Sequence, residues 1–381
     1  MIIFTAKTRN RSETRTPLTP ESAKKLVKLG AQLQAEAGLG LTSGYADAAY
    51  EAAGVTLVTD AAQARQNADI VFGVEKPLSA EIEGMKEGAL FVGTLDPFNR
   101  QDLIRNFAQA KVNAVSMEMV PRTTLAQKMD VLSSQANLAG YYAVIKAAER
   151  LPKIVPMMMT PAGTIAPARI FVLGVGVAGL QAIATAKRLG ARVDAFDTRP
   201  VVEEQVKSLG AKFVKIDLGE MGQTEQGYAK ALTPEQIEMQ RKGMTKVIAQ
   251  SDIVITTAKL FGRPAPTLVT ADMVAAMKPG SVIVDLAAET GGNVEGTQLD
   301  EEAISDNGVR IIGIGKLETM IPTHASQVYA ANLANFVEHF WDSEANVLKM
   351  DIEDEIMAGS LLTLDGEVVH PRFSTTSENG D

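Results

Sequence analysis

The sequence predicts an α/β protein with two doubly wound parallel-sheet (Rossmann-like) domains and a C-terminal β-hairpin. Three observations lead to this fold class. Short apolar runs alternate with helix-like segments, which favours parallel sheets covered on both faces. The length of 381 residues allows roughly two domains of about 150 residues each. Near the C-terminus, Asp365-Gly366 separates two alternating runs, which is a strong hairpin signal.

The first series of strands and helices begins at the N-terminus. Ile2–Thr5 is strand-like, and the next segment has the start and stop residues of a helix: Thr19 as cap, Pro20 in the first turn and Gly30 past the end. Further strands are predicted at Leu33–Ala37, Val55–Val58, Asp69–Val74, Ala89–Gly93 and Val112–Met117, with helices at Ala46–Ala53 and Arg100–Ala108.

A second series follows the Pro- and Met-rich segment Pro152–Pro167, which we interpret as the connection between the domains. Its six strands, with intervening helices, match a complete doubly wound dinucleotide fold. They are predicted at Arg169–Leu173, Arg192–Phe196, Lys212–Ile216, Asp252–Thr257, Val282–Leu286 and Val309–Ile314. A helix over Ser326–Phe340 precedes the hairpin of Ser360–Leu364 and Glu367–His370, which needs a surface on the first domain or on a second subunit.

The composition excludes several classes of protein. Because the chain has no cysteine, it has no disulfide framework, thiolate metal site or cysteine nucleophile, and we expect no metal centre. A net charge of -9 without a Lys/Arg run argues against nucleic acid as a partner. No export signal is apparent, and the longest uncharged stretch, Ile170–Ala186, is short and broken by glycines, so we expect no membrane span.

The strongest motif is Gly174-Val175-Gly176-Val177-Ala178-Gly179, a G-x-G-x-x-G sequence. It follows the strand Arg169–Leu173 and opens a helix over Ala178–Leu189, which is the context that dinucleotide binding requires. The three glycines would allow a tight turn, close approach of a pyrophosphate and close packing of helix on strand, and the helix N-terminus would supply N–H donors. A glycine-rich turn kept for packing is the alternative.

Asp197 ends the next predicted strand, where a carboxylate can accept hydrogen bonds from both ribose hydroxyls. The same carboxylate would repel a 2'-phosphate, which favours NAD over NADP. Arg199, two residues later, weakens this argument because an arginine can receive such a phosphate.

Two further segments have the composition of binding sites. A polar cluster lies in and before a helix that continues to about Arg150, and it could hold a carboxamide and a pyrophosphate, although a solvated helix face explains the pattern equally well. It consists of Arg122, Gln127, Asp130, Ser133, Ser134 and Gln135. The loop Gly219–Leu232 carries Tyr228 beside Gly227 and could fold over a nucleotide or be a surface insertion.

Few residues could act as a proton donor at a hydride acceptor. The three histidines, His324, His339 and His370, are all C-terminal; His339 is interpreted as structural, whereas His324 follows Pro322 near the domain junction and could approach the site. Lys76 lies at the end of a predicted strand of the first domain.

Over nearly its whole length the chain resembles the soluble NAD(H)-binding alpha subunits of proton-translocating NAD(P) transhydrogenases, which are related to alanine dehydrogenases. The stretches that carry the resemblance are Val120–Arg122, Ala126-Gln127, Met129-Asp130, Leu132–Tyr141, Gly176–Ile183, Asp197–Pro200, Gly227–Lys230 and Met277–Ala287.

The resemblance implies a homodimer that holds NADH and passes its hydride to NADP+ on an NADP(H)-binding partner subunit. A membrane-spanning subunit would couple this transfer to proton translocation, which would place the chain in the cytoplasm, peripheral on the inner membrane. We expect an N-terminal domain of residues 1–138 completed by 320–373, an NAD(H)-binding domain of 139–319 and a disordered tail of 374–381.

The resemblance also assigns site residues. Arg122, Gln127, Asp130 and Ser133 would contact the nicotinamide, its ribose and the diphosphate, and Gly227 and Tyr228 would lie on a mobile loop that closes over NAD(H). The remaining cofactor contacts would come from the Gly174–Gly179 turn, from Asp197, Thr198 and Arg199, and from Ala258, Lys259 and Leu260. The C-terminal hairpin would pack across the dimer.

Two departures from the family pattern bear on function. Alanine dehydrogenases have a catalytic His in the loop that here reads Thr94-Leu95-Asp96-Pro97, while Lys76 is retained. Transhydrogenases usually have Leu-Ile-Pro where this chain has Lys259-Leu260-Phe261. The loss of the His argues against amino-acid oxidation, and hydride transfer between two nicotinamide rings needs no acid or base. An alanine-dehydrogenase-like enzyme with Lys76 on the substrate carboxylate is the alternative, and an NADH-sensing protein without turnover is a third interpretation.

Overall fold

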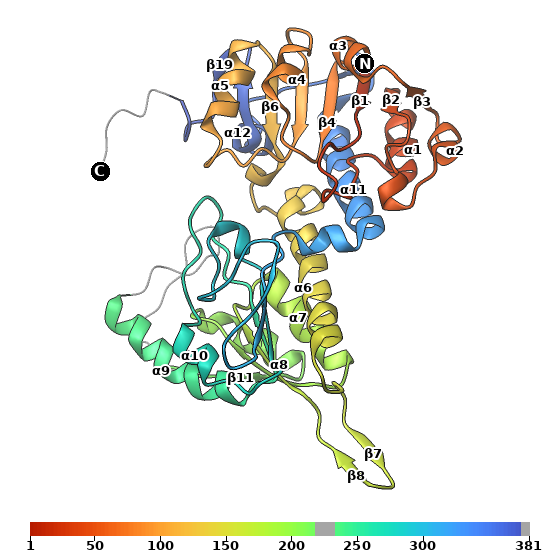
Figure 1. Ribbon diagram of the computed structural model, residues 1–381. Coiled ribbons are helices and arrows are strands. Elements are labelled where there is room, and N and C mark those ends of the chain that lie inside the picture. Colours follow the sequence, from red (N-terminus) through yellow and green to blue (C-terminus); the bar gives the residue numbers. More distant parts are fainter. Residues whose placement is uncertain (218–232, 375–381) are drawn as a thin grey trace. The chain divides into compact units, whose positions relative to one another are not determined.

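The computed structural model describes residues 1–217 and 233–374, and the chain divides into two compact units (Figure 1). Unit 1 contains residues 1–135 and the chain from 321 onward, and unit 2 contains residues 136–320. These divisions fall next to the expected limits at 138/139 and 319/320. All but the first residue of the expected C-terminal tail lies outside the described residues.

Unit 1 is built on a doubly wound sheet, with strands in the order β19-β18-β6-β5-β4-β1-β2-β3 over the described residues. The strands from β1 to β6 are parallel. Their bounds are β1 Ile2–Thr5, β2 Gln32–Glu36, β3 Val55–Val58, β4 Ile70–Gly73, β5 Leu90–Gly93 and β6 Asn113–Ser116, followed near the C-terminus by β18 Leu361–Leu364 and β19 Glu367–Val368. The order reverses between β1 and β4, which is the point where open α/β sheets bind ligands.

The helices of unit 1 follow the predicted start and stop signals. Thr19 caps α1 (Pro20–Lys28) by accepting from the backbone N–H of Ser22, and Gly30 has φ +99°, as a residue past a helix end requires. The other helices are α2 Asp47–Glu51, α3 Ala61–Asn67, α4 Ser79–Glu83, α5 Gln101–Gln109, α11 Pro322–Phe340 and α12 Glu355–Ser360, with 3-10 turns η1 Leu41–Ser43, η2 Met117–Met119 and η3 Ala126–Met129. A short ribbon of β16 (Trp341–Asp342) and β17 (Val347–Leu348) follows α11.

The C-terminal hairpin completes the sheet of unit 1. Asp365 and Gly366 have φ of +50° and +89°, the two left-handed residues that a two-residue hairpin turn of type I′ requires. β18 pairs antiparallel with β6, and Leu361 and Leu362 are buried. The hairpin therefore finds its surface on the first domain, where it covers the edge of β6, which would otherwise offer unpaired backbone groups. The packing of the hairpin across a dimer stays a prediction.

Unit 2 has the strand order of a dinucleotide fold, β11-β10-β9-β12-β13-β15-β14. The strands are β9 Arg169–Leu173, β10 Arg192–Phe196, β11 Lys212–Phe213, β12 Ile253–Thr256, β13 Val282–Asp285, β14 Glu302–Ile304 and β15 Arg310–Ile312. The antiparallel edge strand β14 was not predicted, and β11 is shorter than the expected Lys212–Ile216. The helices are α6 Val131–Arg150, which begins in unit 1, α7 Val177–Arg188, α8 Glu203–Ser208, α9 Pro234–Gln250 and α10 Ala271–Ala275, with 3-10 turns η4 Pro200–Val202, η5 Ala288–Thr290 and η6 Leu317–Met320.

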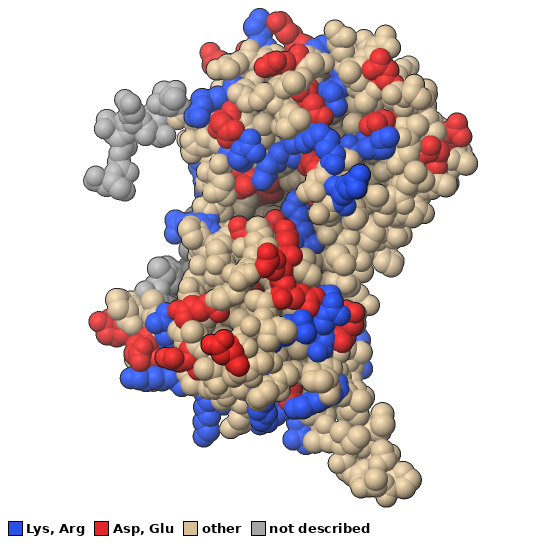
Figure 2. Space-filling view, viewed as in Figure 1, with Lys and Arg blue, Asp and Glu red and all other residues tan. Residues whose placement is uncertain are grey.

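The interpretation of Pro152–Pro167 as the connection between domains is wrong. This segment forms a hairpin of β7 (Met158–Thr160) and β8 (Gly163–Ile165) that projects from unit 2 (Figure 1), and the whole segment belongs to that unit. The chain passes between the units inside α6 and again after Met320. The hairpin carries no charged side chain, and it is uniformly tan in Figure 2.

Each sheet is covered by apolar side chains on both faces, as two doubly wound layers require. In unit 1, Ile3 and Phe72 belong to the core on one face, and Phe4 and Phe91 belong to the core on the other. In the described ranges no helix is long and apolar enough to cross a membrane.

Candidate functional site

The glycine-rich turn of unit 2 lies at the carboxyl end of β9, where the strand order reverses between β9 and β12. Gly174 has φ +93°, and a Cβ on it would lie 2.6 Å from the Thr257 Oγ1. A Cβ on Gly179 would lie 2.0 Å from the Gly174 carbonyl oxygen, whereas no described atom lies within 4 Å of a Cβ built on Gly176. At Gly174 and Gly179 the turn is therefore packed too tightly for a side chain, whereas the space beside Gly176 is free of described atoms. Close approach of a pyrophosphate to the backbone requires such a free space.

The helix that follows this turn starts at Val177, with Gly176 as its N-cap residue. Gly176 has no side chain to bind the first N–H groups of α7, so these donors point out of the helix end unoccupied by a cap. Such an N-terminus attracts an anion through its N–H groups and its dipole. The residues Gly174, Val175, Gly176, Val177, Ala178 and Gly179 thus have the geometry that a dinucleotide needs.

Asp197 follows β10 and lies beside the turn. Its Oδ2 accepts the backbone N–H of Val175 at 2.7 Å, and its Oδ1 accepts the backbone N–H of Arg199 at 2.8 Å. The Arg199 guanidinium also binds both carboxylate oxygens, at 2.9 Å from Nε and 2.8 Å from Nη2, and these bonds raise the pKa of Arg199. Thr198 lies half-buried between the two. The carboxylate is thus in the place of a ribose-binding acid.

Ala258, Lys259 and Leu260 follow β12, the strand next to β9. Ala258 donates its N–H to the Asn293 Oδ1 at 3.0 Å, and the Lys259 ammonium pairs with Glu289 at 2.7 Å. Sequence reasoning missed Asn293, which is fully buried. A lone Asn after a glycine pair carries no pattern that would mark it.

In unit 1 the polar cluster is part of the packing. Asp130 caps α6, since its Oδ1 accepts the Ser133 N–H at 2.9 Å and its Oδ2 accepts the Ser133 hydroxyl at 2.6 Å. Arg122 and Gln127 are exposed. Asp130 and Ser133 therefore fix the start of α6, whatever else they bind.

Ser134 and Gln135 face α11 rather than solvent. The Ser134 hydroxyl donates to Asn332 at 2.7 Å, and the buried Gln135 donates to the Ala325 carbonyl at 3.1 Å while accepting from Arg15 at 3.0 Å. The alternative of a solvated helix face does not apply to these two residues.

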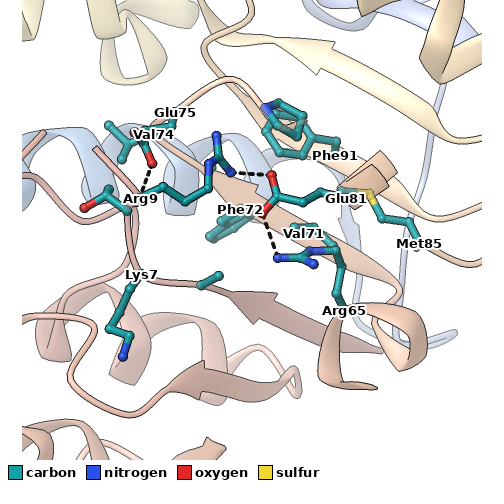
Figure 3. A pocket seen from close by; sticks show the side chains of 14 residues that line it. Lys7, Arg9, Arg65, Val71, Phe72, Val74, Glu75, Glu81, Met85 and Phe91 are labelled. Atoms are coloured by element: carbon teal, nitrogen blue, oxygen red, sulfur yellow. Dashed lines mark hydrogen bonds and ion pairs between the residues drawn. The ribbon is translucent and has the colours of Figure 1, made fainter. Parts of the chain in front are cut away.

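Unit 1 has its own pocket at the carboxyl ends of β1 and β4 (Figure 3). The Glu75 carboxylate accepts the backbone N–H groups of Arg9 and Asn10, at 2.6 and 3.0 Å. Figure 3 shows Glu81 lying between the guanidinium groups of Arg9 and Arg65, and it pairs with both. Glu81 thus pairs with the Arg9 and Arg65 cations, and the Lys7 ammonium pairs with Glu36 at 3.1 Å.

The first turns of the two units share one contact. In unit 1, Glu36 accepts the backbone N–H of Lys7 at 2.9 Å, and in unit 2, Asp197 accepts the backbone N–H of Val175 in the same way. Each carboxylate belongs to the residue that follows the last residue of β2 paired with β1, or the last residue of β10 paired with β9. The units differ at the following residues, since unit 1 fills its turn with Glu75 whereas unit 2 leaves Gly176 open. This difference favours unit 2 as the dinucleotide-binding unit.

Comparison with known proteins agrees with both halves of this architecture. Residues 5–139 match the family described as "Alanine dehydrogenase/PNT, N-terminal domain", and residues 143–371 match "Alanine dehydrogenase/PNT, C-terminal domain". The chain belongs to the alanine dehydrogenase/PNT family.

Within the alanine dehydrogenase/PNT family, relatives of two kinds resemble this chain. It is 44% identical to an NAD(P) transhydrogenase alpha-subunit chain of Rhodospirillum rubrum, over 98% of this chain and 99% of the relative. The solved structure of transhydrogenase from Sinorhizobium meliloti is 44% identical with a TM-score of 0.85, covering 98% of this chain and 100% of that one. Alanine dehydrogenase of Bacillus subtilis is 27% identical over 88% of this chain and 86% of the relative.

The residues that could distinguish the two branches of the alanine dehydrogenase/PNT family lie in unit 1. Lys76 pairs with Asp96 at 3.1 Å, in the loop where alanine dehydrogenases are expected to have a His. Glu118 holds this loop by accepting the N–H groups of Leu95 and Asp96, each at 2.9 Å, and burial raises its pKa. The Lys76 ammonium is thus already engaged by a carboxylate.

The remaining candidates have less direct roles. His324 is exposed in the first turn of α11, His339 lies 3.6 Å from Asp354, and burial lowers the pKa of His370. Gly227 and Tyr228, predicted on the closing loop, lie outside the described residues. Over residues 1–217 and 233–374, no three His, Asp or Glu side chains gather in a way that could hold a metal ion.

Proposed function

We propose that the chain is the NAD(H)-binding subunit of a proton-translocating NAD(P) transhydrogenase, passing a hydride from NADH to NADP+ on a partner subunit. The observation that carries the proposal is the open Gly174–Gly179 turn beside Asp197, in a chain 44% identical over 98% of its length to a transhydrogenase alpha-subunit chain. The coupling to protons would take place in a membrane-spanning subunit.

In this proposal the residues of unit 2 bind and orient. The N–H groups at the start of α7 hold the pyrophosphate, and the Asp197 carboxylate accepts from the adenosine ribose. Thr198, Arg199, Ala258, Lys259 and Leu260 border this half of the cofactor, and Gly227 and Tyr228 close over it. From unit 1, Arg122, Gln127, Asp130 and Ser133 contact the nicotinamide, its ribose and the diphosphate.

A nicotinamide held in this site would supply the hydride, so the protein would have to position the ring and exclude water rather than move a proton. A hydride carries both electrons with the hydrogen, and neither ring gains or loses a proton at the reacting carbon. A loop of Thr94-Leu95-Asp96-Pro97, without a His, suits such a reaction.

The alternative is an NAD-dependent amino-acid dehydrogenase of the alanine dehydrogenase type. Lys76, placed just beyond β4 at the carboxyl edge of the first sheet, favours it, because an ammonium there could receive a substrate carboxylate. Against it, Asp96 already holds the Lys76 ammonium at 3.1 Å. A bound carboxylate would have to compete with Asp96.

We further propose a homodimer that associates with membrane-spanning and NADP(H)-binding subunits, peripheral on the cytoplasmic face of the inner membrane. The β7–β8 hairpin is the dimer arm in this proposal. Met157, Met158, Met159 and Ile165 are 59%, 45%, 77% and 45% exposed, and an apolar surface of this kind is typical of an interface. A second copy of unit 2 is the occupant, because each copy presents the same uncharged arm, and such self-complementary contacts close a twofold dimer.

A reconstitution assay tests the function. The chain is mixed with membranes that contain the NADP-binding and membrane-spanning subunits, and hydride transfer from NADH to an NADP+ analogue is followed. We expect hydride transfer only when the chain and the membranes with the partner subunits are both present. We expect the chain alone to form no NADH from alanine and NAD+. Steady alanine oxidation by the isolated chain would refute the proposal in favour of the alternative.

A further inference from the structure

We propose that Asn293 is a positioning residue of the dinucleotide site: it holds the end of β12 against the glycine-rich turn, and Asp285 holds Asn293 in place. This inference rests on the proposed function in one respect, the binding of NADH by unit 2. All of the residues involved belong to unit 2.

The side chain of Asn293 binds both backbone groups of one residue. Its Oδ1 accepts the Ala258 N–H at 3.0 Å, and its Nδ2 donates to the Ala258 carbonyl at 3.0 Å and to the Pro266 carbonyl at 2.8 Å. Asn293 is fully buried. The Thr257 N–H still donates to the Leu173 carbonyl of β9 at 2.8 Å, whereas the next residue, Ala258, is held on both of its backbone groups by the Asn293 amide.

The fixed segment touches the glycine-rich turn directly. The Thr257 hydroxyl donates to the Gly174 carbonyl at 3.0 Å. A Cβ on Gly174 would lie 2.6 Å from that hydroxyl and 3.3 Å from the Ala258 nitrogen, so the turn and the end of β12 are in close contact. A shift of Ala258 would therefore be transmitted to the turn that approaches the pyrophosphate.

Asp285, the last residue of β13, anchors the segment that carries Asn293. Its carboxylate accepts five hydrogen bonds at 2.7 to 3.2 Å, and the side chain is fully buried. The donors are the hydroxyls of Thr256 and Thr297 and the N–H groups of Ala287, Asn293 and Val294. Gly292 allows this approach, because it has φ +85° and a Cβ on it would lie 2.9 Å from the Asp285 Oδ2.

Only an amide meets the needs of this position. The contacts use an acceptor toward an N–H and donors toward two carbonyl oxygens, a combination that Asn provides and Asp does not. An Asp at this position would place a carboxylate against the carbonyls of Ala258 and Pro266, and an Ala would leave three backbone groups without their partner. Either change would release the end of β12 from its place beside Gly174.

The test compares Asn293→Ala and Asn293→Asp with Asn307→Ala in the full-length chain. Asn307 is a matched control: its Nδ2 also donates to backbone carbonyls of unit 2, those of Val274, Ala275 and Met277, but at the amino ends of β13 and β15, the opposite edge of the sheet from the turn. NADH affinity is measured by titration, and amide hydrogen exchange reports the opening of the Gly174–Gly179 turn.

We expect both Asn293 variants to bind NADH at least tenfold more weakly and to exchange faster in the turn, with the rate of hydride transfer at saturating NADH little changed. Asn307→Ala should lose a similar amount of stability while its NADH affinity and turn exchange stay within twofold of the parent chain. Equal effects of the two Ala variants, or no effect of Asn293→Ala on either readout, would overturn the inference. If the parent chain binds no NADH, the proposed function fails, and the exchange readout still decides the role of Asn293.

Discussion

The Asp197 carboxylate and the Arg199 guanidinium form a two-point pair at the mouth of the glycine-rich turn, with N···O distances of 2.9 and 2.8 Å. The pair bears on an ambiguity of the sequence, in which Arg199 could receive a 2'-phosphate. Because Asp197 holds the guanidinium, a phosphate that approached Arg199 would also meet the carboxylate. The pair therefore favours NAD(H) over NADP(H).

Asp197→Asn should weaken NADH binding by roughly tenfold to a hundredfold, since hydrogen bonds to charged groups contribute about 1.5–3 kcal/mol and about 1.4 kcal/mol corresponds to tenfold in affinity. NADPH binding should weaken less, because Arg199 is released toward the phosphate. Titration with both nucleotides measures the ratio. The control is Asp194→Asn in β10, because the Asp194 carboxylate pairs with Arg169 at 3.7 Å and is not part of the glycine-rich turn. If the ratio of the NADH affinity to the NADPH affinity were the same in Asp197→Asn as in the parent chain, Asp197 would not be the residue that selects NADH.

A second prediction concerns Glu302 on the edge strand β14. Hydrogen bonds from Arg150 are the main cause that lowers the pKa of Glu302 from 4.5 to about 2. Lys146 lowers this pKa further, whereas partial burial of the carboxylate opposes the shift. The Lys146 ammonium is buried and lies 3.0 Å from this carboxylate. Glu302→Gln should therefore lower the free energy of unfolding by about 1–3 kcal/mol near neutral pH, as expected for a lost charged partner. Urea unfolding measures the difference.

The pH dependence of this effect follows from the direction of the shift. Since the folded-state pKa lies below the unfolded one, the stabilisation is fully present above pH 4.5 and is lost as the pH falls toward 2. The stability difference between the parent chain and Glu302→Gln should therefore shrink from pH 6 to pH 3. The exposed neighbour Glu301 provides the control variant, Glu301→Gln. A difference that stayed constant with pH would show that Glu302 contributes through packing alone.

Much of the fold was predictable because local signals agreed with the global pattern. β9 and β10 match their predicted bounds, since each is an apolar run followed by a turn or cap. β14 was missed because Glu302-Ala303-Ile304 is short and charged, and only its pairing with β15 makes it a strand. Pro152–Pro167 was misread because Pro, Gly and small residues mark a linker and a projecting hairpin equally well.

The site was predictable in part for the same reason. A glycine pattern after a strand has few other uses, so Gly174 and Gly179 could be assigned from the sequence. Asp285 and Asn293 act through contacts between loops that are distant in sequence, and no spacing marks them. The local hydrogen bonds between Asp130 and Ser133 show that a polar cluster can also serve as a helix cap.

A third prediction concerns the β7–β8 hairpin. Met159→Lys places a charge on a side chain that is 77% exposed, so the fold should be kept while burial of the arm against a second copy becomes unfavourable. Analytical ultracentrifugation should show a shift from dimer to monomer at unchanged thermal stability. Met239→Lys, at a methionine of α9 that is 46% exposed, should leave the dimer intact. A dimer that survives Met159→Lys would exclude the arm as the main contact.

A fourth prediction concerns the turn of unit 1 that Glu75 fills. Glu75→Ala removes the acceptor of the Arg9 and Asn10 N–H groups and should cost about 1–3 kcal/mol of unfolding free energy. Acetate at tens of millimolar should restore part of this loss, because its carboxylate can enter the pocket and bind the same N–H groups. The exposed Glu83 provides the control variant, Glu83→Ala. If acetate changed the unfolding free energy of the parent chain, Glu75→Ala and Glu83→Ala equally, the turn of unit 1 would not be a specific anion-binding site.

We propose that NADH bound to this chain passes its hydride directly to a second nicotinamide nucleotide. The most direct measurement uses NADH carrying deuterium at the transferred position, with NADP+ and membranes that contain the partner subunits. We expect one deuterium per turnover to appear in NADPH and none in water, and we expect the chain without partners to make no NADH from alanine. Deuterium released into water, or NADH formation from alanine by the chain alone, would contradict this proposal.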